Sequence, residues 1–338
     1  MLRIVQLALL VLVFSPTAVH AQYTVPGFEG TVRMTMSPVH PRPGDLVTLS
    51  LESALIDLAR STVSWEVDGR PRTGDDTRLS FVAPALGARA SVRALVTTPE
   101  GSLIEAALVI APTELDLLYE SDSYTPPFYR GRALPSAGST LRLQALPRFK
   151  KPDGSFVPTS EIIFTWRKNG QVLGSLSGRG RATAVIPSPL LFSTDTILVE
   201  AETRDGAYAG SARASVSSAD PVLRLYEDHP LYGLRFNRAF GTSTDTTARE
   251  LTLAAIPFFA SVGSPTDAAL SYEWTVNGTP VETNEGTRNA LTIGGAEGGE
   301  ARISLNLLHT TNIFFGAEGA WGFVFSRASE ATSPFNPF

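Results

Sequence analysis

Apolar and polar residues alternate in short runs along most of the chain, which is the period-two pattern of half-buried β-strands. The clearest runs are residues 46–51, 141–146 and 251–256, and further runs follow at 90–96, 196–201 and 301–307. Residues 55–59 could form a short helix at most. The pattern indicates no amphipathic helix of three or more turns. Short strands bounded by turn residues predict an all-β protein built from sandwiches.

At three places a tryptophan stands four residues before a glycine that follows Asp or Asn. The segments are 65–69, 166–170 and 274–278, and the tryptophans lie 101 and 108 residues apart. Asp-Gly and Asn-Gly favour tight hairpin turns because both central residues of such a turn need a positive φ. We therefore expect three domain-sized repeats, with Trp65, Trp166 and Trp274 as structural core anchors.

These segments resemble the central strand and hairpin of bacterial immunoglobulin-like and PKD-like domains. The resemblance covers the chain through its repetition and implies three tandem immunoglobulin-like β-sandwiches that act as exported stalk or interaction modules. The sequence departs from both families in places. No copy carries the Asp-Phe-Gly-Asp-Gly pattern of the PKD strand, and the cysteine pair of antibody domains is missing.

Residues 1–21 have the layout of a cleaved signal peptide. A short positive start precedes an apolar stretch of about 11 residues, which is too short to span a bilayer, and small residues stand before Gln22. Retention of this segment as an uncleaved anchor is the alternative. We expect an exported protein located outside the cell, on its surface or in the periplasm, with no transmembrane span after cleavage.

A second repeat sets the domain boundaries. Leu-Tyr-Glu at 118–120 and at 225–227 precedes an aromatic, proline-containing stretch in each case. The predicted domains are 23–112, 113–220 and 221–325, followed by a flexible tail at 326–338. The links between domains are short and contain proline, which favours a semi-rigid arrangement.

The composition of the chain excludes several kinds of catalytic and metal site. The chain has no cysteine, so thiol nucleophiles, Cys zinc sites and disulfides are excluded. Its formal charge of −5 argues against nucleic acid as a partner. No serine-hydrolase or phosphate-binding motif appears, and only three histidines follow the signal peptide, at positions 40, 229 and 309, far apart in the sequence. We predict no catalytic, cofactor or metal residues and no enzymatic activity.

Acidic residues near the boundaries leave one open alternative for a metal. Glu120, Asp122, Glu227 and Asp228 lie where stacked sandwiches can bind calcium through converging carboxylates. No regularly spaced calcium loop accompanies them, so ordinary polar turns are the simpler interpretation.

Two groups of residues are candidate surfaces. The boundary aromatics Tyr124, Phe128, Tyr129, Tyr232 and Phe236 recur in two repeats, which favours a wedge between domains; a partner-binding or sugar-stacking surface is the alternative. A basic stretch holds eight cations and two acids between residues 142 and 181. From it we select, as a candidate anion patch, Arg148, Lys150, Lys151, Arg167 and Lys168.

Together these features predict a non-catalytic exported or cell-surface spacer and interaction protein whose partners are other cell-envelope proteins or surface polymers. Two alternatives stay open. One is a module that binds a glycan or an anionic polymer, and the other is a subunit of a surface appendage assembled by strand pairing.

Overall fold

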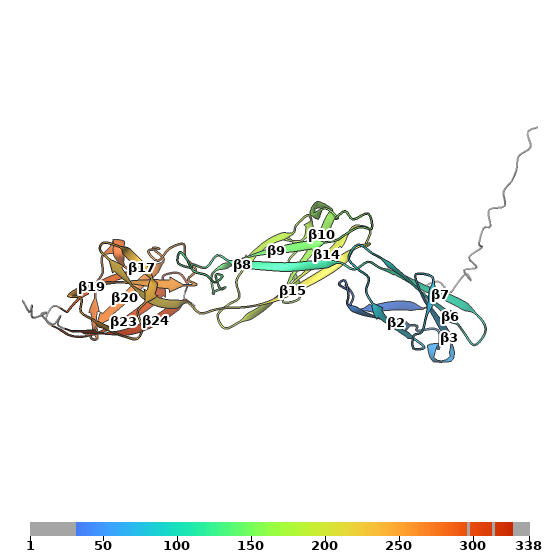
Figure 1. The fold of residues 1–338 in the computed structure, drawn as a ribbon, viewed down its shortest axis with the longest axis horizontal. Coiled ribbons are helices and arrows are strands. Elements are labelled where there is room, and N and C mark those ends of the chain that lie inside the picture. The colour runs from blue at the N-terminus through green and yellow to red at the C-terminus, as the bar shows by residue number, and fades with distance from the viewer. Residues whose placement is uncertain (1–31, 296–297, 313–314, 327–338) are drawn as a thin grey trace, which may run out of the picture. The chain divides into compact units, whose positions relative to one another are not determined.

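The structure is a computed structural model that describes residues 32–295, 298–312 and 315–326 (Figure 1). The predicted signal peptide and most of the predicted tail lie outside the described residues. Within them the chain is all-β, as predicted: strands form six sheets, and three single-turn 3-10 helices interrupt them at Leu58–Arg60, Thr159–Glu161 and Glu285–Thr287. The sheets pack in pairs as three sandwiches.

The described chain divides into two compact units. The first holds residues 32–38, 46–82 and 90–110, and the second holds residues 39–45, 83–89 and everything from 111 onward. The second unit therefore includes the second and third sandwiches together with two loops, which connect β1 to β2 and β5 to β6 in the sequence.

The first sandwich has a three-stranded and a four-stranded antiparallel sheet. The smaller sheet has the order β1 (Arg33–Ser37), β2 (Leu46–Glu52), β5 (Arg78–Val82). The larger has the order β4 (Arg70–Arg72), β3 (Thr62–Val67), β6 (Ala90–Thr97), β7 (Leu103–Ile110). The first, second and fifth strands thus face the third, fourth, sixth and seventh, which is the arrangement of an immunoglobulin-like sandwich.

The second sandwich repeats this order. One sheet contains β13 (Thr183–Pro187), β9 (Thr140–Arg148) and β8 (Glu114–Ser121). The other contains β11 (Gln171–Val172), β10 (Ile162–Lys168), β14 (Thr194–Thr203) and β15 (Ala209–Ser217), and the two-residue β12 (Gly178–Arg179) also pairs with β10.

The third sandwich adds two strands to the common order. Its first sheet runs β17 (Gly233–Ala239), β16 (Val222–His229), β19 (Glu250–Phe258), β22 (Ala290–Gly294). Its second runs β18 (Ser243–Thr246), β24 (Gly316–Phe325), β23 (Gly299–His309), β20 (Leu270–Val276), β21 (Thr279–Val281). Strand β17 folds back on β16 as a hairpin, and β18 pairs with β24 in parallel.

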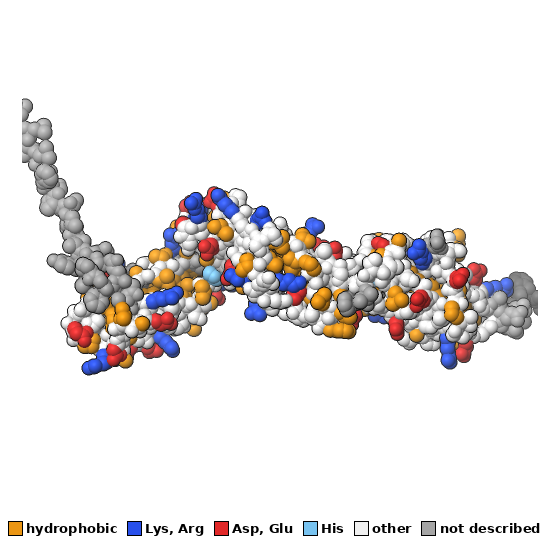
Figure 2. Space-filling model, turned by 180° about the vertical axis from the view of Figure 1, so that it is seen from behind, with side chains coloured by type: hydrophobic (Ala, Val, Ile, Leu, Met, Phe, Trp, Pro, Cys, Tyr) orange, Lys and Arg blue, Asp and Glu red, His pale blue; other side chains and the backbone are white. Residues whose placement is uncertain are grey.

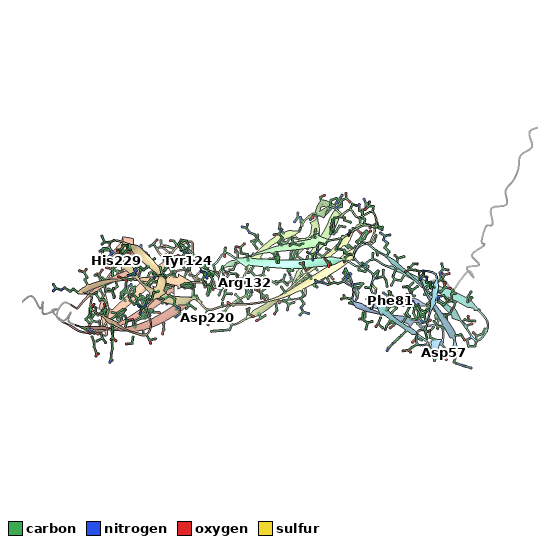
Figure 3. The ribbon with its side chains drawn as sticks, viewed as in Figure 1. Asp57, Phe81, Tyr124, Arg132, Asp220 and His229 are labelled. Carbon is green, nitrogen blue, oxygen red and sulfur yellow. The ribbon has the colours of Figure 1, made fainter. Side chains whose placement is uncertain are left out.

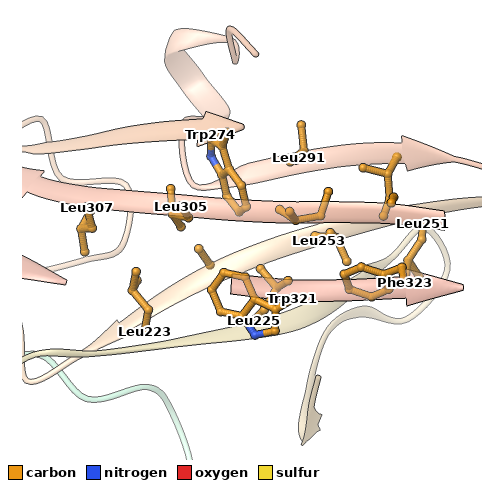
Figure 4. Close-up of a cluster of buried hydrophobic side chains, with 14 of the residues drawn as sticks. Leu223, Leu225, Leu251, Leu253, Trp274, Leu291, Leu305, Leu307, Trp321 and Phe323 are labelled. Carbon is orange, nitrogen blue, oxygen red and sulfur yellow. The ribbon is translucent and has the colours of Figure 1, made fainter. Parts of the chain in front are cut away.

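Each core is built around its tryptophan. Trp65, Trp166 and Trp274 are at most 3 % exposed. Their indole nitrogens donate to backbone oxygens of Asp75, Arg181 and Arg288, so the buried N–H group is satisfied in all three copies. In the third sandwich, leucines from both sheets surround Trp274 and Trp321 (Figure 4).

The hairpin after each tryptophan is held by its Asp or Asn residue. Asp68, Asn169 and Asn277 have φ of 51°, 51° and 49°, and the following glycines also have positive φ, as a type I′ turn requires. Each Asp or Asn side chain accepts a hydrogen bond of 2.8 Å from a backbone N–H of the neighbouring strand, at Ser91, Thr196 and Arg302 respectively. The repeated pair therefore shapes the turn and fixes it to the adjacent strand.

The predicted strands at 46–51, 141–146 and 251–256 lie inside β2, β9 and β19 and are confirmed. The hairpin of β16 and β17 was not anticipated, since this stretch was treated as a boundary segment. Strand β7 ends at Ile110 and β8 begins at Glu114, and β15 ends at Ser217 and β16 begins at Val222. The boundaries proposed at 112/113 and 220/221 remain predictions.

Candidate functional site

The junction loop, residues 122–139, connects β8 to β9 in the second sandwich and bonds to the third sandwich (Figure 3). The Tyr124 N–H donates to the Ala260 carbonyl at 2.7 Å, and the Phe259 N–H donates to the Tyr124 carbonyl at 2.7 Å. This pair of bonds engages both backbone polar groups of Tyr124. It joins the loop to the chain just beyond the end of β19.

Aromatic rings pack around this bridge. The Tyr129 ring meets Phe258 and Phe259 edge-on, with centroids 5.6 and 5.9 Å away. The Tyr124 ring packs against the core of the third sandwich, and burial raises the pKa of its hydroxyl. Phe259 is buried with φ of 61°, an uncommon value for a bulky residue, so the packing holds the backbone in a strained region.

A second pair of bonds closes the other end of the junction loop. The Asn312 Nδ2 donates to the Ala137 carbonyl at 2.9 Å, and the Ala219 N–H donates to the Pro135 carbonyl at 2.6 Å. Gly138 has φ of 92°, and a Cβ there would lie 2.4 Å from the Asn312 Nδ2. Glycine is favoured at this position, because a side chain would strain the backbone and would displace the Asn312 amide.

A cluster of buried serines anchors the junction loop to its own sandwich. The hydroxyl of Ser139 is 3.1 Å from that of Ser121 and 2.7 Å from that of Ser188, and it also donates to the Ser136 carbonyl at 2.8 Å. The Ser123 hydroxyl donates to the Leu134 carbonyl at 2.6 Å. These contacts satisfy polar groups that burial would otherwise penalise.

The two predicted aromatic groups have different surroundings. Tyr124 and Tyr129 lie in the junction loop against the third sandwich, whereas Phe128 is 92 % exposed with φ of 66°. Tyr232 is 76 % exposed at the tip of the β16–β17 hairpin, where its ring packs at a tilt against that of His229 with centroids 4.7 Å apart. Phe236 packs edge-on against Tyr226 at 5.4 Å within that hairpin. The sequence repeat therefore does not give the two stretches one shared role.

Most of the candidate anion patch is engaged in ion pairs. Arg148 contacts Glu114 at 2.5 Å and Asp116 at 2.9 Å, and the hydrogen bond to Glu114 is the main reason why its pKa is raised. Arg167 pairs with Glu200 at 2.9 Å, and Lys168 pairs with the largely buried Asp195 at 2.7 Å. Basic and acidic side chains are interspersed on the visible face rather than forming a field of one sign (Figure 2).

The two remaining lysines of the patch lie on the loop after β9. Lys150 forms an isolated bridge with Phe156, and its side chain approaches Gly87 in the loop between β5 and β6. Lys151 lines a separate pocket of the second sandwich. The five residues are thus divided among several local environments.

The acidic residues considered for calcium are also dispersed. Asp122 accepts hydrogen bonds from the N–H and hydroxyl of Thr140, and Glu227 pairs with Arg235 at 3.1 Å. Glu120 and Asp228 are exposed. Among the described residues, no three or more His, Asp or Glu side chains gather closely enough to hold a metal ion.

Several contacts of the second unit involve residues that the sequence did not single out. Arg42 pairs with Asp116 at 3.6 Å and donates to the Leu115 carbonyl, and Arg89 stacks over the Tyr208 ring and donates to its hydroxyl at 2.8 Å. Isolated arginines in loops carry no local signal of such roles. The same holds for Asn312, which is 175 residues from its partner Ala137.

No helix within the described ranges is both long and apolar enough to cross a membrane. No protein-family model matches the chain, and no curated protein matches it in sequence.

Solved structures with tandem domains do match. The three N-terminal domains of the bacteriophage RB49 outer capsid protein Hoc are 15 % identical, cover 88 % of this chain and 99 % of their own, and give a TM-score of 0.24. The central fibronectin-III array of RIM-binding protein is 13 % identical, with 87 % and 96 % covered and a TM-score of 0.31.

A Bacteroides ovatus mixed-linkage glucan utilization protein, SGBP-B, solved with a heptasaccharide, is 12 % identical, with 87 % and 71 % covered and a TM-score of 0.24. At these values the likenesses carry no conclusion about the activity of this chain.

Proposed function

We propose that the protein is a non-catalytic spacer and interaction module, exported to the cell surface or periplasm. The observation that carries this proposal is the junction loop, which bonds the second sandwich to the third through the two backbone bonds of Tyr124 and the Asn312 bond. A loop closed onto its neighbour by backbone pairing and aromatic packing resists bending better than a free linker does. The signal-like N-terminus supports export.

The test measures the distance between the second and third sandwiches. The chain has no cysteine, so Ser215→Cys and Arg302→Cys introduce two exposed sites that alone take a spin label. Pulsed electron spin resonance on the intact chain should give a narrow distance distribution. The added pair Tyr129→Ala and Asn312→Ala should broaden it, because the loop loses the ring contacts with Phe258 and Phe259 and the side-chain bond to the Ala137 carbonyl.

The matched control is Tyr232→Ala, which removes an exposed tyrosine far from these contacts in the sequence. It should leave the distribution unchanged. A broad distribution in the unaltered chain, or one that the junction variants do not affect, would overturn the spacer role.

A second role, binding of a protein or surface polymer, is favoured by one observation. The β16–β17 hairpin presents Leu231 and Tyr232 at 82 % and 76 % exposure. Exposed aromatic residues are common anchors of interfaces. Loss of cell-envelope binding in a Leu231→Ser, Tyr232→Ser double variant that keeps its thermal stability would support this role, and unchanged binding would exclude the hairpin tip.

A further inference from the structure

A pocket of about 590 Å³ lies at one end of the second sandwich. It is formed by the loop after β9, the start of β10, strand β12 and the turn between β14 and β15. This volume is in the range of small-ligand sites. Its lining includes Lys151, Glu161, Ile163, Arg179, Arg204 and Tyr208.

Three cations face this pocket from different elements. Lys151, Arg179 and Arg204 contribute their charges, and none of the ion pairs seen among the described residues involves them. This contrasts with the paired cations Arg148, Arg167 and Lys168 of the same sandwich. Arg179 Nε donates to the Ser160 carbonyl at 2.9 Å, but no ion pair among the described residues neutralises the three charges, so together they raise the electrostatic potential that attracts an anion.

The pocket is not purely basic. Glu161 is exposed at its edge, and Asp205 accepts hydrogen bonds from the Thr203 hydroxyl at 2.6 Å and from the Ala207 N–H at 3.2 Å. The hydrogen bond to Thr203 is the main reason why the pKa of Asp205 is lowered, with a smaller effect of Arg89. The Asp205 carboxylate is therefore an acceptor at neutral pH, and Val157 and Ile163 add apolar surface.

This combination suits a ring that carries one carboxylate and several hydroxyl groups. Arginine binds a carboxylate through paired hydrogen bonds, carboxylates accept hydroxyl protons, and apolar side chains contact the C–H face of a sugar ring. A polyphosphate would bring several negative charges close to Glu161 and Asp205, so a ligand with a single carboxylate suits this mixed lining better. We propose that the pocket binds a uronic-acid residue of an acidic polysaccharide.

This site is independent of the spacer role, because none of its lining residues belongs to the junction loop. The test is isothermal titration calorimetry of the intact chain with trigalacturonate, with its methyl-esterified form and with tripolyphosphate. Trigalacturonate should bind saturably. Arg179→Ala and Arg204→Ala should each weaken binding about tenfold or more, since each removes a charge-assisted hydrogen bond.

Arg142→Ala is the matched control, since Arg142 is an exposed arginine on β9 of the same sandwich and outside the pocket. It should change the affinity less than about twofold if specific hydrogen bonds rather than general charge attract the ligand. The methyl ester should bind at least about tenfold more weakly because its carboxylates are masked.

Three results would overturn the proposal: no saturable binding of trigalacturonate, equal losses in the pocket and control variants, or tighter binding of tripolyphosphate. Circular dichroism of each variant separates loss of the pocket from loss of the fold.

Discussion

At the residue scale, the Asn of the repeated turn combines two requirements that few residues meet together. Asn169 has a positive φ, accepts from the Thr196 N–H and donates from Nδ2 to Asp195 at 2.7 Å. Asparagine tolerates the left-handed region because its short side chain can hydrogen-bond locally. The sequence pair Asn-Gly predicted the turn, but it held no information about the strand to which the side chain bonds.

Asn169→Ala should destabilise the second sandwich by about 2 kcal/mol, because it forces alanine into the left-handed region and removes two side-chain bonds. Asn169→Gly should cost roughly half as much, since glycine accepts the backbone conformation and loses only the bonds. Urea unfolding followed by tryptophan fluorescence measures both. Equal losses in the two variants would show that the backbone conformation contributes nothing.

Tyr272 makes the stability of the third sandwich depend on alkaline pH. Burial raises the pKa of its hydroxyl, which donates to the Pro265 carbonyl at 2.6 Å. The folded state therefore holds the proton more tightly than the unfolded chain, whose tyrosines titrate near 10. The contribution is complete below about pH 10 and is lost as the pH rises above that value.

We therefore expect thermal stability to fall above about pH 10 more steeply in the unaltered protein than in Tyr272→Phe, which cannot ionise. Differential scanning calorimetry between pH 7 and 11 gives the comparison. Tyr232→Phe, at an exposed tyrosine, is the control and should follow the unaltered protein. Parallel curves for all three proteins would refute the assignment to Tyr272.

At the element scale, strand β24 depends on a glycine for the packing of its tryptophan. A Cβ at Gly319 would lie 2.1 Å from the ring of Trp321, which is buried in the third core. Gly319→Ala should therefore displace the ring and destabilise this sandwich by about 1–3 kcal/mol.

The control on the same strand is Gly316→Ala, where the new methyl group would have its nearest neighbour at 3.8 Å. It should be neutral or slightly stabilising, because alanine reduces the freedom of the unfolded chain. Calorimetric melting temperatures distinguish the two variants. A Gly319→Ala protein as stable as Gly316→Ala would mean that the ring has room to move.

The structures of the two aromatic boundary stretches could not be predicted from their sequences. Their composition and spacing repeat, yet one becomes the junction loop and the other the β16–β17 hairpin. The difference arises from partners distant in sequence: Tyr124 pairs with Ala260, and Asn312 bonds to Ala137. Periodicity reports which face of a strand is buried, but it does not report which segments meet.

The candidate anion patch likewise shows what sequence distance cannot predict. Eight cations in a short stretch suggested a basic surface, whereas Glu114, Asp116, Asp195 and Glu200 neutralise several of them from neighbouring strands. Strand pairing, rather than sequence distance, decides which charges meet. Arg204, which follows β14 and was outside the predicted patch, instead joins Lys151 and Arg179 at the pocket.

At the scale of the whole molecule, the number and type of the sandwiches were predictable because each repeat carries its own tryptophan, hairpin and alternating strands. These are local signals that reflect burial within one sandwich. The grouping into units was not predictable, since it depends on loops. Residues 39–45 and 83–89 belong to the second unit although the strands on either side of them belong to the first.

This grouping should be visible in unfolding. Trp65 lies in the first unit and Trp166 in the second. Each Trp→Ala change should lower the free energy of unfolding of its own sandwich by about 3–5 kcal/mol. In calorimetry, Trp65→Ala should lower the melting temperature of one transition only, that of the first unit. Trp166→Ala should lower the melting temperature of a larger transition in which the second and third sandwiches unfold together, because the junction loop couples their cores. A separate, unshifted third-sandwich transition in Trp166→Ala would show that the junction bonds do not transmit stability.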